Sequence, residues 1–230
     1  MRSALFLHTQ KTAGTSIQEM ARQFYGDNNV IGYDQHERLS LQACASVPFL
    51  SGHFGFEFAR PFMADRYSFT FLRDPVERVL SLYAYALSRP DGEWPIFDDA
   101  KKAGLEGFLR DHRFRRHVWN NQVWQLSYGW YAWLVGLEKK QVEDFTSEDL
   151  LDRARSNLAR FNYVGFVDTI GVDAVAIFRE LGWDAPEVPH ANASPRGLMS
   201  ADLSDSHLAL LHEVTELDRR LFEYAKRAYA

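Results

Sequence analysis

Several polar and small residues near the start of the chain could bind an anion. Lys11 supplies a positive charge, Gly14 lets the backbone approach a bound group closely, and hydroxyl groups lie beside them. The apolar residues 4–7 before them are typical of a buried strand, and helical spacing of apolar side chains begins near Thr15. The start of that helix would add unpaired N–H groups and a favourable dipole. The candidate anion-binding residues are Lys11, Thr12, Ala13, Gly14, Thr15 and Ser16.

The order of these residues differs from the P-loop of nucleoside triphosphatases. That motif opens with a glycine and places its lysine after a second glycine, whereas here Lys11 precedes Gly14. A helix cap with an incidental lysine would explain the same residues without a ligand.

A second candidate anion-binding element combines Arg73 with Ser81. Residues 67–72 read as a strand, and Asp74-Pro75 then begins a helix as its cap and first residue. Ser81 falls on this helix, so the Arg73 guanidinium and the Ser81 hydroxyl could hold one phosphate from two sides. Arg78 could pair with Asp74 one helical turn earlier.

His53 is the candidate general base. It follows a predicted strand at residues 47–52, and the neighbouring glycines would expose its imidazole to a substrate hydroxyl. Packing between Phe54 and Phe56 is the structural alternative. The spacing of the other histidines does not predict a metal site.

The remaining pattern alternates strands with helices. A further strand is expected at 161–167, and helices are expected near 75–87, after Thr146 or Ser147, at 172–181 and from about Ser204 onward. Residues 89–104 and 186–195 read as loops because they contain prolines and glycines. This order predicts an α/β fold, a single domain over residues 1–230 with a central, mainly parallel sheet flanked by helices. Ligands of such sheets bind beyond the carboxyl ends of the strands.

Composition and charge exclude several classes of protein. The 230 residues are 46% hydrophobic and 25% charged, which is typical of a globular protein, and the net charge of −5 argues against general nucleic-acid binding. The single cysteine, Cys44, excludes an internal disulfide and a multi-cysteine metal site. The apolar run at residues 4–7 ends too early for a signal peptide, so we expect no stable membrane insertion.

Two motifs in this order resemble a known enzyme family. Lys-Thr-Ala-Gly-Thr-Ser at residues 11–16 and Arg-Asp-Pro-x-x-Arg-x-x-Ser-x-Tyr at residues 73–83 are similar to the phosphate-binding elements of carbohydrate sulfotransferases, such as the heparan sulfate 2-O- and 6-O-sulfotransferases. Gln10 stands where that family often has proline. Residues 120–122, 163–166 and 217–225 resemble later segments, so the likeness extends over most of the chain.

The resemblance implies a P-loop-like sulfotransferase fold and a defined chemistry. The donor would be 3′-phosphoadenosine 5′-phosphosulfate (PAPS), the product adenosine 3′,5′-bisphosphate, and no metal would be needed. Lys11 would stabilise the leaving phosphate, Arg73 and Ser81 would bind the 3′-phosphate, and His53 would be the catalytic base. Ser194 and Arg196 lie where the family has a segment that closes over the nucleotide, although a plain surface loop would explain them equally.

The acceptor implied by the resemblance is a hydroxyl of a carbohydrate or glycoconjugate. A basic segment at residues 110–117 and the tryptophans at 119, 124, 130 and 133 could line a channel for an anionic sugar, or form a solvated helix face and a core. The expected location is the cytoplasm of a bacterium, unless the chain is a soluble domain trimmed from a longer protein. The sequence does not indicate an oligomeric state.

Two other functions remain open at this point. A small-molecule kinase or nucleoside triphosphatase with a variant phosphate loop would need a carboxylate for Mg²⁺, a role that Asp74 could take. A non-catalytic homologue that binds a nucleotide or a polysaccharide would keep the fold without needing Lys11 and His53 together.

Overall fold

One parallel sheet forms the centre of the computed structural model, which describes residues 1–184, 186–189 and 203–230. Its strand order is β2-β3-β1-β4-β5, with β1 in the middle, and every pair of neighbours runs parallel. The strands are β1 (Ala4–Leu7), β2 (Val30–Ile31), β3 (Phe49–Gly52), β4 (Tyr67–Leu72) and β5 (Tyr163–Phe166). This arrangement confirms the predicted α/β class.

The strands are mainly apolar and are buried along nearly their whole length, because helices cover both faces of the sheet. Leu5 and Leu7 of β1 belong to the core on one face, whereas Ala4 and Phe6 belong to the core on the other. The Phe6 ring stacks on Phe69 of the next strand, with ring centres 4.9 Å apart. A continuous apolar run is the expected pattern for a strand that is buried on both sides.

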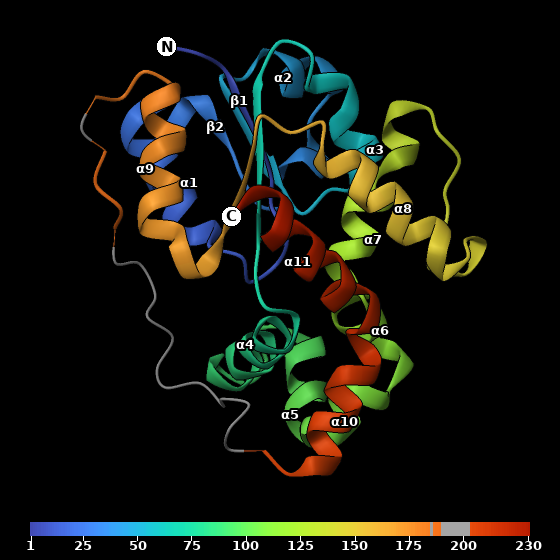
Figure 1. Ribbon diagram of the computed structural model, residues 1–230. Coiled ribbons are helices and arrows are strands. Elements are labelled where there is room, and N and C mark those ends of the chain that lie inside the picture. The colour runs from blue at the N-terminus through green and yellow to red at the C-terminus, as the bar shows by residue number, and fades with distance from the viewer. Residues whose placement is uncertain (185, 190–202) are drawn as a thin grey trace.

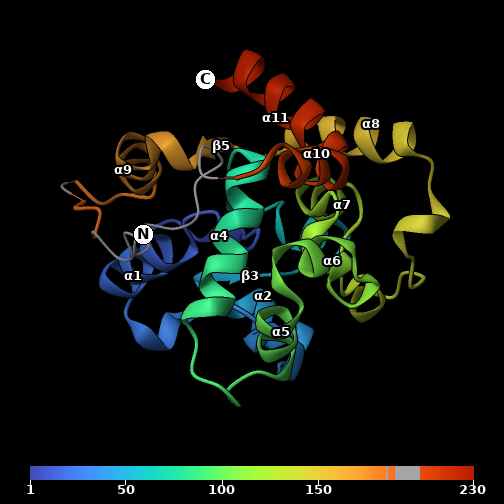
Figure 2. The same cartoon turned by 90° about the horizontal axis from the view of Figure 1, so that it is seen from below.

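Helices lie in three groups around this sheet. The described helices are α1 (Gly14–Tyr25), α2 (Leu41–Ser46), α3 (Phe56–Ala59), α4 (Pro75–Ser88), α5 (Pro95–Arg110), α6 (Arg115–Val118), α7 (Asn121–Ser127), α8 (Ser147–Leu158), α9 (Ile170–Glu180), α10 (Asp205–Val214) and α11 (Glu216–Tyr229). Helices α1 and α9 cover one face, and α3, α7, α8 and α11 cover the other (Figure 1). A third group, with α4, α5 and α10, packs around its own core beyond the carboxyl ends of the strands (Figures 1 and 2).

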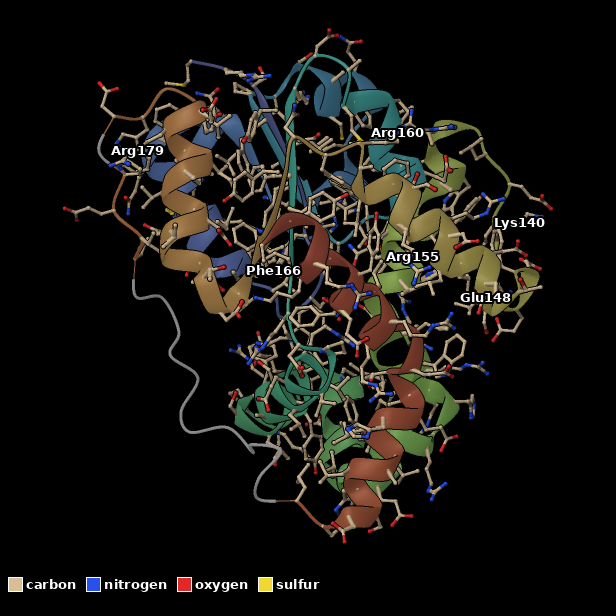
Figure 3. The ribbon with its side chains drawn as sticks, viewed as in Figure 1. Lys140, Glu148, Arg155, Arg160, Phe166 and Arg179 are labelled. Atoms are coloured by element: carbon tan, nitrogen blue, oxygen red, sulfur yellow. The ribbon has the colours of Figure 1, made fainter. Side chains whose placement is uncertain are left out.

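Helix α11 is fastened to both α8 and β5. Arg220 of α11 forms an ion pair with Glu148 of α8 at 2.9 Å, and the Arg155 guanidinium lies 5.3 Å from the Tyr224 ring centre. Phe166 at the end of β5 meets the ring of Phe222 edge-on. Figure 3 labels Glu148 and Arg155, which belong to α8, and Phe166 of β5, which lies beside α11. These contacts fix α11 against the sheet.

Local sequence signals predicted several of the helix boundaries. The Asp74 carboxylate caps α4 by accepting a hydrogen bond from Glu77 N at 3.0 Å, and Pro75 is the first helical residue, as predicted. Thr146 caps α8 in a reciprocal arrangement with Asp149, which confirms the expected start.

Two expectations about the elements were wrong, and one strand was not predicted. The predicted loop at 89–104 is helical from Pro95, because proline suits the first turn of a helix and Gly104 absorbs a kink with φ 67°. The closing segment is two helices that meet at Thr215, not one helix. Val30–Ile31 adds an edge strand that the sequence did not signal. Ser194 and Arg196 lie outside the described residues, as does the predicted loop from residue 190 to residue 195.

Candidate active site

The loop between β1 and α1 is a tight turn closed by its own hydrogen bonds. Lys11 and Ala13 adopt left-handed backbone conformations, with φ of 67° and 64°. The buried Thr12 hydroxyl donates to the Thr9 carbonyl at 2.7 Å, so this hydroxyl is used within the loop. Ala13, the residue before the helix, offers no side-chain cap to the first turn of α1. The beginning of α1 therefore keeps the polarity that favours an anion.

Gly14 is required by a close approach between the loop and His8. A Cβ atom added to Gly14 would lie 1.8 Å from Cε1 of the His8 imidazole. The His8 ring is buried, and its pKa is well below the usual value because of that burial. A neutral imidazole therefore packs directly against the loop at Gly14.

Lys11 is the cation of this loop, and the protein partly desolvates it. Its ammonium lies 4.2 Å from the centre of the Tyr85 ring of α4. Burial, and then the neighbouring Arg73 charge, lower the pKa of Lys11 to about 8. No carboxylate of the described residues opposes this lowering of the Lys11 pKa, so a bound anion would stabilise the ammonium.

Arg73 joins the first loop from the end of β4. Its Nη1 donates to the carbonyl oxygen of Lys11 at 3.3 Å, which brings the two predicted anion-binding elements into contact. Two turns into α4, the hydroxyl of Ser81 is buried and has no hydrogen-bond partner in the part of the chain that the structure describes. A buried hydroxyl in this state is uncommon and fits a site for a polar ligand.

The His53 tautomer follows from its hydrogen bond. Its Nδ1 lies 3.0 Å from the carbonyl oxygen of His8, and since a carbonyl only accepts, Nδ1 carries the proton. Nε2 then keeps its lone pair and can accept a proton. Burial lowers the pKa of His53, while Asp34 and the bond to His8 oppose this effect. The imidazole is therefore neutral at pH 7.

Arg78 does not form the expected pair with Asp74. Its side chain is buried, and its Nη2 donates to the carbonyls of His117 at 3.0 Å and Val118 at 3.2 Å. Burial lowers its pKa to about 10, although the nearby Asp218 carboxylate acts in the opposite direction. Arg78 therefore ties α4 to the end of α6.

Two residues at the site carried no motif that sequence reasoning could use. The Nδ1 of His117 lies 3.2 Å from Oε1 of Gln10, and burial lowers the pKa of His117 to about 4, helped by Arg116 and other cations. Tyr33 presents a half-exposed ring 6.1 Å from that of His53 and has φ of 49°. A left-handed conformation is unusual for an aromatic residue and was not readable from the sequence.

The proposed basic and aromatic channel is only partly assembled. Arg110, Arg113 and Arg115 are paired with carboxylates on the surface, and Trp124 is buried in the core. Arg116 instead lies 5.6 Å from the centre of the Trp130 ring. The Trp130 carbonyl accepts a hydrogen bond from Gly55 N at 3.0 Å, so this pair lies beside the segment that carries His53.

The described residues contain neither a cluster of metal ligands nor a membrane-spanning helix. Within residues 1–184, 186–189 and 203–230, no group of three or more His, Cys, Asp or Glu side chains is arranged to hold a metal ion. No helix in this part of the chain is long and apolar enough to cross a bilayer.

The described chain is thus an α/β protein with one parallel sheet, and a lysine loop, a helix N-terminus and an arginine meet at the carboxyl ends of its strands. The sulfotransferase family model matches residues 2–225, and the chain therefore belongs to this family of enzymes. No curated protein matches the sequence significantly. Among solved structures, mouse sulfotransferase SULT7A1 complexed with PAP is 12% identical, with a TM-score of 0.37 over 97% of this chain and 89% of that one.

Proposed function

We propose that the protein transfers the sulfuryl group of PAPS to a hydroxyl of a carbohydrate or glycoconjugate. The contact between Arg73 and Lys11 at 3.3 Å carries this proposal, because it joins two anion-binding elements in one site. A nucleotide with phosphates at both its 5′ and 3′ positions would engage both elements. Lys11 and residues 12–16 would bind the 5′-phosphosulfate, and Arg73 with Ser81 would bind the 3′-phosphate.

The reaction assigned to this site is an in-line transfer. The acceptor oxygen forms a bond to sulfur while the bond from sulfur to the 5′-phosphate oxygen breaks, and Nε2 of His53 takes the hydroxyl proton. Lys11 stabilises the charge that develops on the leaving adenosine 3′,5′-bisphosphate. Catalysis would consist largely of positioning and electrostatic stabilisation, as in phosphoryl transfer.

Ser194 and Arg196 belong to the same proposal as further ligands of the 3′-phosphate. They lie outside the described residues, so this assignment is supported by their place in the sequence motif alone.

The carbohydrate acceptor is supported by the surface next to His53. The Arg116–Trp130 pair is joined to the His53 segment through Gly55, and three residues after Trp130 the side chain of Trp133 exposes 44% of its area. Aromatic faces suit the apolar sides of sugar rings, and a guanidinium suits a carboxylate or a sulfate.

A kinase with a variant phosphate loop agrees less well with the geometry. Asp74 was the carboxylate available for Mg²⁺, but its side chain accepts a hydrogen bond from Glu77 N and begins α4. A non-catalytic homologue would not need the His53 tautomer that leaves Nε2 free to accept a proton.

Calorimetric titration with three nucleotides tests the proposal. Adenosine 3′,5′-bisphosphate is expected to bind at least tenfold more tightly than 5′-AMP, since a charged hydrogen-bonded pair contributes about 1.5–3 kcal/mol. ATP with Mg²⁺ is expected to bind weakly. Preference for ATP with Mg²⁺ would replace the sulfotransferase assignment by a kinase.

A further inference from the structure

Two buried glutamines on one face of α7 hold the backbones that carry Arg73 and His53. Gln122 and Gln125 are three residues apart, so their side chains leave the short helix in similar directions. Both are buried, with exposed fractions of 1% and 0%. Neither contributes to the apolar core, and each instead forms hydrogen bonds with main-chain groups at the site.

Gln122 completes the end of β4. Arg73 N donates to Oε1 of Gln122 at 3.1 Å, and Nε2 of Gln122 donates back to the Arg73 carbonyl at 3.1 Å. The ladder from β4 to β5 has its last pair at Leu72 and Phe166, one residue earlier. The primary amide therefore acts on Arg73 as another strand would, and it restricts the direction in which the arginine leaves the sheet.

Gln125 performs a similar task around His53. Its Nε2 donates to the carbonyls of His8 at 3.0 Å and Phe54 at 2.8 Å. The same His8 oxygen also accepts the hydrogen bond from Nδ1 of His53. Gln125 therefore connects the end of β1 to the residue directly after the proposed base.

The two glutamines project from a fixed support. The Asp218 carboxylate of α11 accepts hydrogen bonds from Gln122 N at 3.2 Å and Val123 N at 2.7 Å. In return, Oδ1 of Asn120 accepts from Leu217 N at 2.8 Å and Asp218 N at 3.1 Å. Each of the two helices thus caps the other, and α7 is held against α11 (Figure 2).

We propose that Gln122 and Gln125 are separate positioning residues of the transfer reaction. Gln122 orients Arg73 toward the 3′-phosphate, and Gln125 orients His53 toward the acceptor hydroxyl. This inference rests on the proposed function, because that function assigns Arg73 and His53. At Gln122 the amide supplies both a donor and an acceptor, and at Gln125 it donates both hydrogen bonds. Methionine can form none of these bonds, and an ionised glutamate cannot donate.

The test uses Gln122→Met and Gln125→Met, which keep side-chain length and remove the hydrogen bonds. Each variant is the control for the other. Gln122→Met is expected to weaken adenosine 3′,5′-bisphosphate about tenfold and 5′-AMP less than twofold, because it loses two hydrogen bonds that orient the 3′-phosphate ligand. It should leave the NMR titration of the His53 imidazole unchanged.

Gln125→Met is expected to change the titration of His53 and to leave nucleotide affinity nearly unchanged. Without the Gln125 amide, the His8 carbonyl accepts a hydrogen bond from His53 and no longer from Gln125. Its interaction with the protonated imidazole becomes stronger, so the pKa of His53 should rise by roughly half a pH unit. The acidic limb of the kcat profile should move with it, while bisphosphate affinity stays within about twofold. The titratable groups that interact with His53, which are His8, Asp34, His36 and His117, are the same in both variants.

Equal losses of nucleotide affinity in both variants, or an unchanged His53 titration in Gln125→Met, would overturn the inference. Wild-type protein is titrated first, so a failure to bind the bisphosphate there would contradict the proposed function. The His53 arm would still be measured in free protein. If either variant fails to fold, the rate of hydrogen exchange of the Arg73 amide in the wild type tests its hydrogen bond to Gln122. Slow exchange is expected, and exchange at the unprotected rate would overturn it.

Discussion

The ammonium of Lys11 lies over the ring of Tyr85, 4.2 Å from its centre, and the carbonyl oxygen of the same lysine accepts a hydrogen bond from the Arg73 guanidinium at 3.3 Å. This environment lowers the pKa of Lys11 to about 8 through burial and the Arg73 charge. The free site therefore carries an ammonium that an incoming anion stabilises.

The first prediction concerns the pH dependence of nucleotide binding. Affinity for adenosine 3′,5′-bisphosphate should fall as the pH rises through about 8, because Lys11 loses its proton there. Calorimetry between pH 6.5 and pH 9.5 measures this effect on a scale of roughly tenfold per pH unit well above the pKa. In Lys11→Arg, whose charge persists, the decline should be absent; an equal decline would assign the titration to another group.

The same lysine should make the free protein less stable. The folded-state pKa of about 8 is below the ordinary value of 10.5, so the folded protein releases its proton first as the pH rises. The free energy of unfolding should therefore increase between about pH 8 and about pH 10.5. Lys11→Met should raise the Tm at pH 7 and remove this increase. A lower Tm in Lys11→Met would show that the ammonium is already well solvated.

His53 should be needed for turnover and dispensable for nucleotide binding. His53→Ala is expected to lower kcat by about 10²- to 10⁴-fold, the usual contribution of a positioned base, with bisphosphate affinity nearly unchanged. Because burial lowers the pKa of His53, activity should decline only below about pH 6.5. His112→Ala, at an exposed histidine, serves as the control. Normal turnover in His53→Ala would remove His53 from this role.

Arg73 should discriminate for the 3′-phosphate. Arg73→Ala is expected to weaken adenosine 3′,5′-bisphosphate by about 10- to 100-fold, since it removes a charged hydrogen-bonding partner, and to affect 5′-AMP far less. Arg110→Ala removes an exposed arginine that is paired with Glu106, and should leave both affinities unchanged. Equal losses for both nucleotides in Arg73→Ala would contradict the assignment.

Gly14 should tolerate no side chain. Gly14→Ala introduces a Cβ that would lie 1.8 Å from the His8 ring, so the loop or the histidine must move. We expect a loss of about 1–3 kcal/mol in stability together with weaker nucleotide binding. Gly171→Ala is the matched control, because no atom of the described residues lies within 4 Å of its new Cβ, and α9 should gain up to about 1 kcal/mol. Unchanged binding in Gly14→Ala would mean that the loop adapts freely.

The sequence predicted the parts of the site that are built locally. Lys11 and Gly14 follow a buried strand directly, and Arg73 precedes a helix start marked by Asp74 and Pro75, so neighbouring residues determine their surroundings. The same reasoning predicted the parallel sheet from four short, mainly apolar runs, whereas the two-residue strand β2 gave no signal.

The contacts between distant segments could not be predicted in this way. Gln122 meets Arg73 across 49 positions, and Gln125 meets His8 across 117. No local pattern distinguishes these amides from ordinary surface glutamines. Asp218 interrupts an apolar stripe, yet burial raises its pKa to about 6, and its carboxylate caps a helix 95 residues away. Pairings of this kind depend on the finished fold.

The mutual capping of α7 and α11 also determines the order in which the site can be completed during synthesis. The ribosome releases the lysine loop first, then Arg73, His117 and the glutamines, but Asp218 emerges only after all five described strands have been synthesised. Until then the start of α7 lacks its carboxylate cap, and the two amides have no fixed support. A nascent chain therefore contains all of its described strands before the segment that supports Gln122 and Gln125 is available, and α11 is the last described element to leave the ribosome.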